Sequence, residues 1–272
     1  MLKALLRRLA PGPLRRLVQR RKLDRLVRNY PRRVVSHVYA GTPLRVELAD
    51  GLGEGWYDHD WGPLPELDVL ASSRLKPGAR VFDLGAHQGV VGMILGRRVG
   101  PSGQVVLVEG TPHNVEMCRR NAALNAMPWL TPHHAAVGDQ VGEMQFAAGW
   151  NGQAGELGDY GGLVTVPAIT IDALAERYGR PDVAQVDIEG FEGRALAAAT
   201  ATLAGPTDWS VEVHLGHGLE KAGGSAEQIL SYFPPARFEL FVHDDGDPAA
   251  LPLAETPPER LRRRFFLTAL AR

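Results

Sequence analysis

The sequence predicts an α/β fold, in which helices cover both faces of a mostly parallel sheet. Strand and helix patterns alternate from residue 64 to the end of the chain. Strands that are separated by helical segments are typical of parallel sheets, because each crossover places a helix on a face of the sheet. With 272 residues, 44% of them apolar, the chain is long enough for one large domain or two small ones.

The predicted elements follow one another regularly. A helix over residues 64–75 ends at Lys76-Pro77-Gly78, and a buried strand follows over 79–85. Further helices are predicted over 89–99 and 112–125, on either side of a strand over 104–110. Five more strands complete the prediction, over residues 133–138, 182–188, 209–215, 237–243 and 264–270.

Two segments precede this alternating region. Residues 34–63 are predicted to be extended, as a hairpin with its turn at Gly41-Thr42-Pro43, followed by an aromatic and acidic stretch over 56–61. Residues 1–33 contain twelve Lys or Arg residues and a single acid, Asp24. Leucines at helical spacing predict a basic amphipathic helical arm there. Packing of this arm on the body is favoured, and contact with an anionic membrane surface stays open.

The charge distribution and composition exclude several classes of protein. The formal net charge of -1 combines the basic arm with a strongly acidic body, so we expect no nucleic-acid partner. Cys118 is the single cysteine, which excludes an intramolecular disulfide and fits the reducing cytoplasm. The sequence contains no run of about 18 apolar residues, so no membrane span is predicted. The apolar run at the N-terminus is interrupted by charged residues and does not match a cleaved secretory signal.

The segment Val81 to Gly89 (VFDLGAHQG) carries the most informative motif. It is a buried strand that passes through two glycines into a helix, and ligands of open α/β sheets bind at such strand ends. Glu109 ends the next strand, where a carboxylate accepts the hydroxyls of a ribose. Asp83 would repel a phosphate and suits an ammonium group. The pattern therefore favours S-adenosylmethionine over a dinucleotide.

Six segments give a specific resemblance to a known family. They are VFDLGAHQGVVG, VVLVEGTPHNVEMCRRNAALN, HHAAVGDQVGEMQF, VPAITIDAL, QVDIEGFEGRAL and WSVEVH, and the resemblance they give extends from about residue 64 to residue 214. In this order and spacing they resemble the FkbM family of S-adenosylmethionine-dependent methyltransferases. The resemblance implies a class I, Rossmann-like methyltransferase domain over residues 64–272. Its three α/β/α layers would contain a seven-stranded sheet whose last strand is antiparallel.

The resemblance also implies a cofactor site. Asp83, Gly85, Ala86 and Gly89 would line the methionine end of the cofactor, and Glu109 would hold the ribose. Ala136 and Asp139 would flank the adenine, and Asp187 would lie near the methyl group. In this family the segment before the methyltransferase domain commonly borders the acceptor site, which makes Tyr57 and His59 candidate substrate contacts. Trp150 and Tyr160, in a glycine-rich loop, are further candidates.

Ionisable residues at two strand ends are the candidates for catalysis. Asp187 and Glu189 end one predicted strand, and Glu212 and His214 end the next. Histidine is suited to act as a base near neutral pH, so His214, Asp187 and Glu189 are the predicted catalytic residues. Two alternatives stay open: cofactor-positioning or structural roles for the acids, and a Mg²⁺ ion held by Asp187, Glu189 and Glu212.

The expected function is O-methylation of a hydroxyl on a natural product or saccharide. N-methylation of a peptide or amine is the alternative within the class. A cofactor-binding protein without transferase activity is the alternative from another class. The expected partner is accordingly a small-molecule or peptide acceptor.

Overall fold

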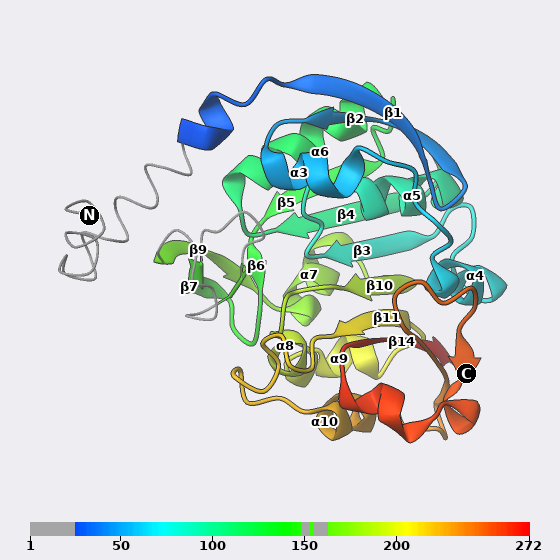
Figure 1. Cartoon of the computed structure of the whole chain (residues 1–272). Coiled ribbons are helices and arrows are strands. Elements are labelled where there is room, and N and C mark those ends of the chain that lie inside the picture. Colours follow the sequence, from blue (N-terminus) through cyan, green and yellow to red (C-terminus); the bar gives the residue numbers. More distant parts are fainter. Residues whose placement is uncertain (1–24, 148–152, 155–162) are drawn as a thin grey trace, which may run out of the picture.

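The computed structural model describes residues 25–147, 153–154 and 163–272 (Figure 1). A central sheet lies between two layers of helices, and a hairpin packs outside one of these layers. Within the described ranges, no helix is both long and apolar enough to cross a membrane. Most of the predicted basic arm falls outside these residues, as do Trp150 and Tyr160.

The central sheet contains eight strands among the described residues. They are β3 (Arg80–Leu84), β4 (Gln104–Glu109), β5 (Leu130–His134), β10 (Val183–Val186), β11 (Asp208–Val213), β12 (Phe238–His243), β13 (Leu251–Pro252) and β14 (Phe265–Ala271). Their order is β13-β12-β14-β11-β10-β3-β4-β5. The strands from β5 to β11 are parallel, and β14 runs antiparallel to both of its neighbours. The predicted seven-stranded sheet with an antiparallel last strand is confirmed, and the short β13 extends one edge.

Helices cover both faces of this sheet. Successive side chains of a strand point to opposite faces, so Val105 and Leu107 of β4 pack with one layer while Val106 and Val108 pack with the other. The first layer consists of α4 (Pro65–Ser72), α5 (Val90–Val99) and α6 (Pro112–Leu124). The second consists of α7 (Ile171–Tyr178), α8 (Glu192–Ala197), α9 (Thr200–Leu203) and α10 (Ala226–Ser231). The predicted three-layer architecture is therefore confirmed.

The segment before the central domain forms a hairpin and a helix. β1 (Arg33–Tyr39) pairs antiparallel with β2 (Thr42–Leu48), and α3 (Gly51–Tyr57) follows. The turn consists of Ala40 and Gly41, with φ angles of 46° and 76°. Two central residues with positive φ suit the tight turns that join antiparallel strands. The prediction of a turn at Gly41-Thr42-Pro43 was wrong for its last two residues, because Thr42 and Pro43 already belong to β2.

Two asparagines of the α6 region attach this hairpin to the central domain. The Oδ1 atoms of Asn121 and Asn125 accept hydrogen bonds from the backbone N–H groups of Glu47 and Arg45, at 2.8 and 3.0 Å. Asn125 Nδ2 also donates to the Arg45 carbonyl at 2.7 Å. The asparagine side chains thus satisfy backbone groups of β2 as a neighbouring strand would. The hairpin is held in a defined position beside α6.

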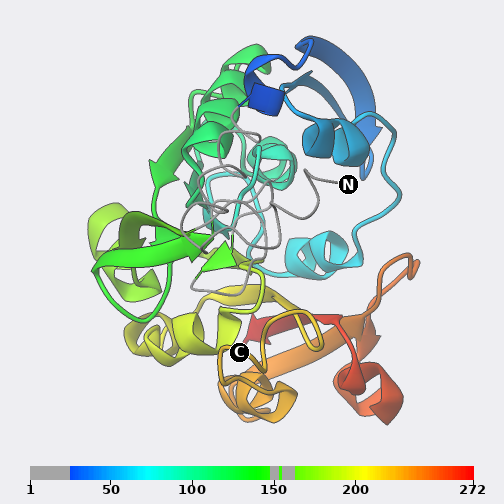
Figure 2. The same cartoon turned by 60° about the vertical axis from the view of Figure 1, so that its left-hand side comes forward.

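A second, smaller sheet lies beyond the carboxyl ends of the central strands (Figure 2). Its described strands are β6 (Ala136–Val137), β7 (Gly142–Ala147), β8 (Gln153–Ala154) and β9 (Leu163–Ile169), in the order β6-β9-β7-β8. The strand predicted over residues 133–138 is divided at Ala135, so that β5 joins the central sheet and β6 joins the second one. The second sheet is positioned to form a wall at the edge where ligands bind.

Candidate active site

The turn after β3 brings two strand ends into close contact. Gly85 has a φ of 89°, and a Cβ atom at this position would lie 1.6 Å from the carbonyl oxygen of Asp187. Its backbone N–H donates to the Val108 carbonyl at 2.9 Å. A glycine is therefore required, both for the left-handed backbone and for the close approach of the chain that follows β10. This contact joins the ends of β3, β4 and β10.

Glu109, at the end of β4, is a buried carboxylate with both oxygens oriented by backbone groups. Oε2 accepts from the His87 N–H at 3.0 Å, and Oε1 accepts from the Thr111 N–H at 2.6 Å. Each carboxylate oxygen can accept a second hydrogen bond. Glu109 therefore keeps acceptor capacity for a ligand hydroxyl.

Asp83 and Glu109 form a buried acidic pair. Burial raises the pKa of Glu109 to about 7, although its backbone hydrogen bonds oppose this. Burial and the charge of Glu109 raise the pKa of Asp83 to about 7 as well. Asp83 Oδ2 is buried and has no hydrogen-bond partner among the described residues. Two such carboxyl groups create a local potential that favours a cationic ligand.

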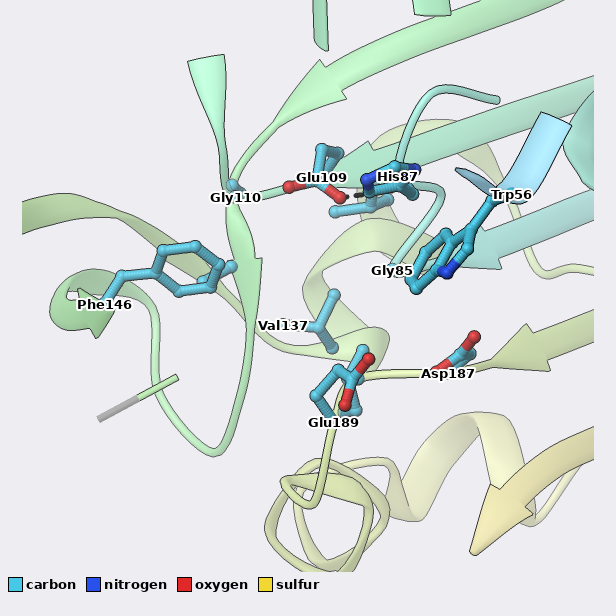
Figure 3. Close-up of a pocket in the computed structure, with 13 residues that line it drawn as sticks. Trp56, Gly85, His87, Glu109, Gly110, Val137, Phe146, Asp187 and Glu189 are labelled. Atoms are coloured by element: carbon cyan, nitrogen blue, oxygen red, sulfur yellow. Dashed lines mark hydrogen bonds between the residues drawn. The ribbon is translucent and has the colours of Figure 1, made fainter. Parts of the chain in front are cut away.

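A pocket with an empty volume of about 530 Å³, part of it open to solvent, lies above these strand ends (Figure 3). Figure 3 shows Glu109 and His87 on one side of the pocket, Phe146 and Trp56 at opposite ends, and Asp187 and Glu189 facing the glutamate. The lining residues are Trp56, Gly85, His87, Val108, Glu109, Gly110, Ala135, Ala136, Val137, Phe146, Asp187, Ile188 and Glu189.

The predicted cofactor residues fall into three groups. Four line the pocket: Gly85, Glu109, Ala136 and Asp187. Three lie in or beneath the turn without lining it: Asp83, Ala86 and Gly89.

Asp139 forms the third group. Its exposed carboxylate pairs with Arg194 at 2.9 Å and borders a separate open groove. The structure thus places Asp139 outside the pocket, because the chain turns away from the site after β6.

The chemistry of this pocket fits S-adenosylmethionine. Apolar side chains from β4, β6 and β7 provide surfaces for an adenine ring, and Glu109 can accept hydrogen bonds from a ribose diol. The buried Asp83 and Glu109 carboxyl groups favour the positive charges of an ammonium and a sulfonium. None of the described residues that line the pocket is Lys or Arg, as expected for a ligand without phosphate groups.

Helix α3 contributes Trp56, which sequence reasoning did not assign to the cofactor pocket. Asp50 caps this helix by accepting from the N–H groups of Leu52 and Gly53. Its other oxygen accepts from Gln88 Nε2 at 2.7 Å, which ties α3 to the turn after β3. Trp56 is 39% exposed, and its ring lies 4.8 Å from the His87 ring, centroid to centroid.

The substrate residues predicted from the same segment lie elsewhere. Tyr57 is buried, and its hydroxyl is 2.6 Å from His87 Nδ1. His59 is exposed and is not part of the pocket lining. Because the segment is helical at this point, Trp56 faces the pocket and Tyr57 faces the core. The aromatic composition indicated the segment but not which ring faces the ligand.

Four carboxylates surround His214 at the ends of β10 and β11. His214 Nδ1 is 2.8 Å from Oε1 of Glu192, which is fully buried. His214 Nε2 faces Glu212 at 3.2 Å, Glu189 at 3.6 Å and Asp187 at 3.7 Å. The predicted convergence of Asp187, Glu189, Glu212 and His214 is observed. Glu192 was missed because it belongs to the next helix.

The surroundings of His214 favour a role different from the predicted general base. Burial alone lowers the pKa of His214, but the hydrogen bonds with Glu192 and Glu212 outweigh it and raise the pKa to about 11. The imidazole therefore holds a proton at neutral pH when no other cation is bound. His214 is also only 3% exposed and does not line the pocket. Asp187 and Glu189 do line it.

The same cluster contains a set of metal-ligand atoms. One oxygen each of Asp187 and Glu212 and one nitrogen of His214 lie within 4.8 Å of one another. Compared with the predicted magnesium ligands, His214 takes the place of Glu189. Arg264 Nη1 lies 2.9 Å from Glu212 Oε1 and also pairs with Asp245.

Together, the sheet order, the glycine turn after β3 and the acidic strand ends define a class I S-adenosylmethionine-dependent methyltransferase. Residues 83–240, more than half of the chain, match the family described as the methyltransferase FkbM domain. The chain belongs to this family. It is a methyltransferase whose cofactor is S-adenosylmethionine.

Solved methyltransferase structures are similar to the chain at low sequence identity. An FkbM methyltransferase from Methylobacillus flagellatus KT is 18% identical, with a TM-score of 0.45, over 70% of this chain. The chain spans 43% of the length of that protein. A SAM-dependent O-methyltransferase from Thermotoga maritima is 11% identical, with a TM-score of 0.45, over 88% of this chain and 77% of that one.

Aeropyrum pernix fibrillarin, solved with natively bound S-adenosyl-L-methionine, is 15% identical, with a TM-score of 0.42. It matches over 89% of this chain and 83% of its own. No curated protein matches the sequence.

Proposed function

We propose that this methyltransferase transfers the methyl group to a hydroxyl of a ring-bearing small molecule, a saccharide or another natural product. The observation that carries the proposal is the composition of one end of the pocket. The half-exposed Trp56 lies there, and the Asp187 and Glu189 carboxylates line the adjoining side of the pocket, opposite Glu109. An aromatic face packs against the apolar face of a sugar or polyketide ring, while carboxylates accept hydrogen bonds from its hydroxyls.

In the proposed reaction, this chain positions the acceptor and removes its proton. The bound cofactor supplies an electrophilic methyl group. Asp187 or Glu189 accepts the hydroxyl proton as the acceptor oxygen forms its bond to the methyl carbon and the bond from carbon to sulfur breaks. Partial burial and the nearby Glu212 carboxylate raise the pKa of Asp187 above its usual range, which makes it a stronger base than an ordinary aspartate. His214 is a positioning residue that orients both carboxylates.

The charge of the pocket disfavours the alternative N-methyltransferase function. Carboxylates near an amine stabilise its protonated form, and a protonated amine has no free electron pair for the attack. A hydroxyl has no such protonated state at neutral pH, and the same carboxylates assist its deprotonation. We therefore place O-methylation first.

The buried, free Cys118 suits the reducing cytoplasm, which we propose as the location.

The test uses S-adenosylmethionine labelled with ¹³C in its methyl group and a panel of saccharide, polyketide, amine and peptide acceptors. The chemical shift of the transferred carbon distinguishes O-methyl from N-methyl products. We expect O-methyl products, and a decrease in kcat of about 10²–10⁴-fold in Asp187→Asn. The matched control is Asp139→Asn, whose carboxylate lies outside the pocket. Methyl transfer to nitrogen alone, or full turnover by Asp187→Asn, would overturn the proposal.

A further inference from the structure

The structure assigns a binding site for a divalent first-row transition metal ion to Asp187, Glu212 and His214. The inference goes beyond the proposed methyl transfer and does not depend on it; with the ion bound, Asp187 is a ligand and Glu189 is the carboxylate that can accept the acceptor proton. It rests on the arrangement of the donor atoms, on the support behind the histidine and on the balance of charge.

The donor atoms are already arranged around one point. Asp187 Oδ1 lies 3.7 Å and Glu212 Oε1 lies 3.2 Å from His214 Nε2, and the three donors lie within 4.8 Å of one another. The residues come from the carboxyl ends of the adjacent parallel strands β10 and β11. Ligands about 2.0–2.2 Å from a central ion are separated from each other by roughly 3–4 Å. Only small side-chain adjustments are therefore needed.

His214 has the support that metal-binding histidines require. A ligating imidazole almost always donates its second N–H to a carboxylate, a backbone carbonyl or a water, which fixes the ring and increases the basicity of the ligating nitrogen. Glu192 takes this position, with Oε1 2.8 Å from His214 Nδ1 and no exposed surface. The same oxygen accepts from the Gly190 N–H at 2.9 Å, so the carboxylate is itself held in place. Nε2 is thereby directed at Asp187 and Glu212.

The loop that carries Asp187 and Glu192 is fixed against the loop after β11. A Cβ atom on Gly190 would approach the Gly218 backbone to 2.6 Å. This packing keeps the donors of the two loops in register.

The balance of charge in the cluster favours a bound cation. Asp187, Glu192 and Glu212 face a single imidazole. Arg264 is the one guanidinium within ion-pair distance of these three carboxylates in the described part of the chain, and it is shared with Asp245. Neighbouring carboxylates repel one another when they are ionised, as the effect of Glu212 on the pKa of Asp187 indicates. A divalent ion would offset this repulsion, and Arg264 would keep Asp245 as its partner.

The nitrogen ligand selects the type of ion. Mg²⁺ and Ca²⁺ prefer oxygen ligands alone, whereas imidazole suits transition ions such as Fe²⁺, Ni²⁺ and Zn²⁺. One histidine and two carboxylates therefore favour a transition ion over the magnesium that a purely carboxylate set would indicate. The occupant is thus a different class of ion from the one expected from the sequence.

The test measures metal binding by the full chain directly, without methyl transfer. After treatment with a chelator and dialysis, the protein is titrated with Co²⁺, followed by visible absorption, and with Mn²⁺, followed by the electron paramagnetic resonance of the free ion. We expect one saturable site for each ion that Mg²⁺ at equal concentration does not displace. Absence of saturable Co²⁺ and Mn²⁺ binding would overturn the inference, as would displacement by equimolar Mg²⁺.

Variants identify the ligands. His214→Ala and Glu212→Gln should lose saturable binding, and Glu192→Gln should weaken it by about 10–100-fold, the usual effect of losing the group behind a ligand. His217→Ala is the matched control, because His217 is exposed and lies three residues away. Near-ultraviolet circular dichroism and S-adenosylmethionine affinity report whether each variant is folded. Undiminished metal binding by folded His214→Ala or Glu212→Gln would overturn the assignment.

Discussion

Two buried glutamates at the carboxyl edge of the sheet are held in contrasting ways. Glu109 accepts hydrogen bonds from two backbone N–H groups, and its charge raises the pKa of a second buried acid, Asp83. Glu192 accepts from one backbone N–H and from the His214 imidazole. Among the described residues, no cationic side chain pairs with Glu109, whereas Glu192 pairs with His214. A buried carboxylate without a cationic partner marks a place where a ligand supplies the charge.

The two glutamates therefore have different roles: Glu109 faces a ligand pocket, and Glu192 holds the His214 ring in place. At the end of β4, the protein presents negative charge toward a pocket that fits a cationic cofactor. At the ends of β10 and β11, the negative charge is organised around His214, and Asp187 and Glu189 line the pocket. The two regions meet where Gly85 contacts the Asp187 carbonyl.

Substitution of Gly85, where the two regions meet, should have the largest effect on stability and on cofactor binding. Gly85→Ala places a methyl group against the Asp187 carbonyl oxygen on a backbone with positive φ, so the ends of β3 and β10 must separate. We expect a loss of roughly 3–5 kcal/mol in the free energy of unfolding, measured by chemical denaturation, and loss of cofactor binding. Gly100→Ala is the control, because Gly100 has a φ of 66° but nothing within 4 Å of an added Cβ. Equal losses in both variants would contradict the account.

Removing the charge of Glu192 should destabilise the protein. Glu192→Gln keeps the size of the side chain but removes the ionic part of its hydrogen bond with His214. We expect the free energy of unfolding in chelator to fall by about 1–3 kcal/mol at neutral pH, as for the loss of a buried charged hydrogen bond. Chemical denaturation measures it, and Glu227→Gln on the surface of α10 serves as the control. If Glu192→Gln were as stable as the wild type or more stable, Glu192 would not be stabilised by its contact with His214, and the proposed difference from Glu109 would be wrong.

Replacing Glu109 with glutamine should instead increase the free energy of unfolding above pH 7. Burial raises the pKa of Glu109 from 4.5 to about 7, so folding favours the protonated form. The stability contributed by this group is complete below about pH 4.5 and is lost as pH rises through 7. Relative to the wild type without ligand, Glu109→Gln should gain about 1–3 kcal/mol between pH 5 and pH 8. Denaturation curves at both pH values test this, and a difference that does not depend on pH would count against it.

The smallest effect is expected at Asp139. Its exposed ion pair with Arg194 contributes less than about 1 kcal/mol to stability. Because Asp139 lies outside the pocket, Asp139→Ala should leave the Kd for S-adenosylmethionine unchanged in calorimetric titration. A marked loss of affinity would extend the cofactor site beyond the residues that line the pocket.

The sequence predicted the features that depend on local pattern. The strands that end at Glu109, Asp187 and His214 were visible as apolar runs, and parallel strands bring their carboxyl ends to one edge. Features that depend on contacts between distant segments were not visible. Glu192 reaches His214 from the start of α8, and β6 to β9 form a sheet through pairings that no periodicity reveals.

Trp56 shows a second limit of sequence reasoning. The stretch Gly51 to Tyr57 contains three glycines and has no clear apolar period, so α3 was not predicted as a helix. The cap from Asp50 and the bond from Gln88 stabilise it from outside its own sequence. Without the helix, the orientations of Trp56 and Tyr57 could not be assigned.

A calorimetric titration with S-adenosylmethionine tests the central claim most directly. The wild type should bind one cofactor per chain, and Glu109→Ala should bind about 10–150-fold more weakly, since it loses hydrogen bonds to a charged group. Glu116→Ala, which removes an exposed glutamate of α6, should bind like the wild type. Equal affinity of Glu109→Ala and the wild type, or no binding by the wild type, would contradict the account.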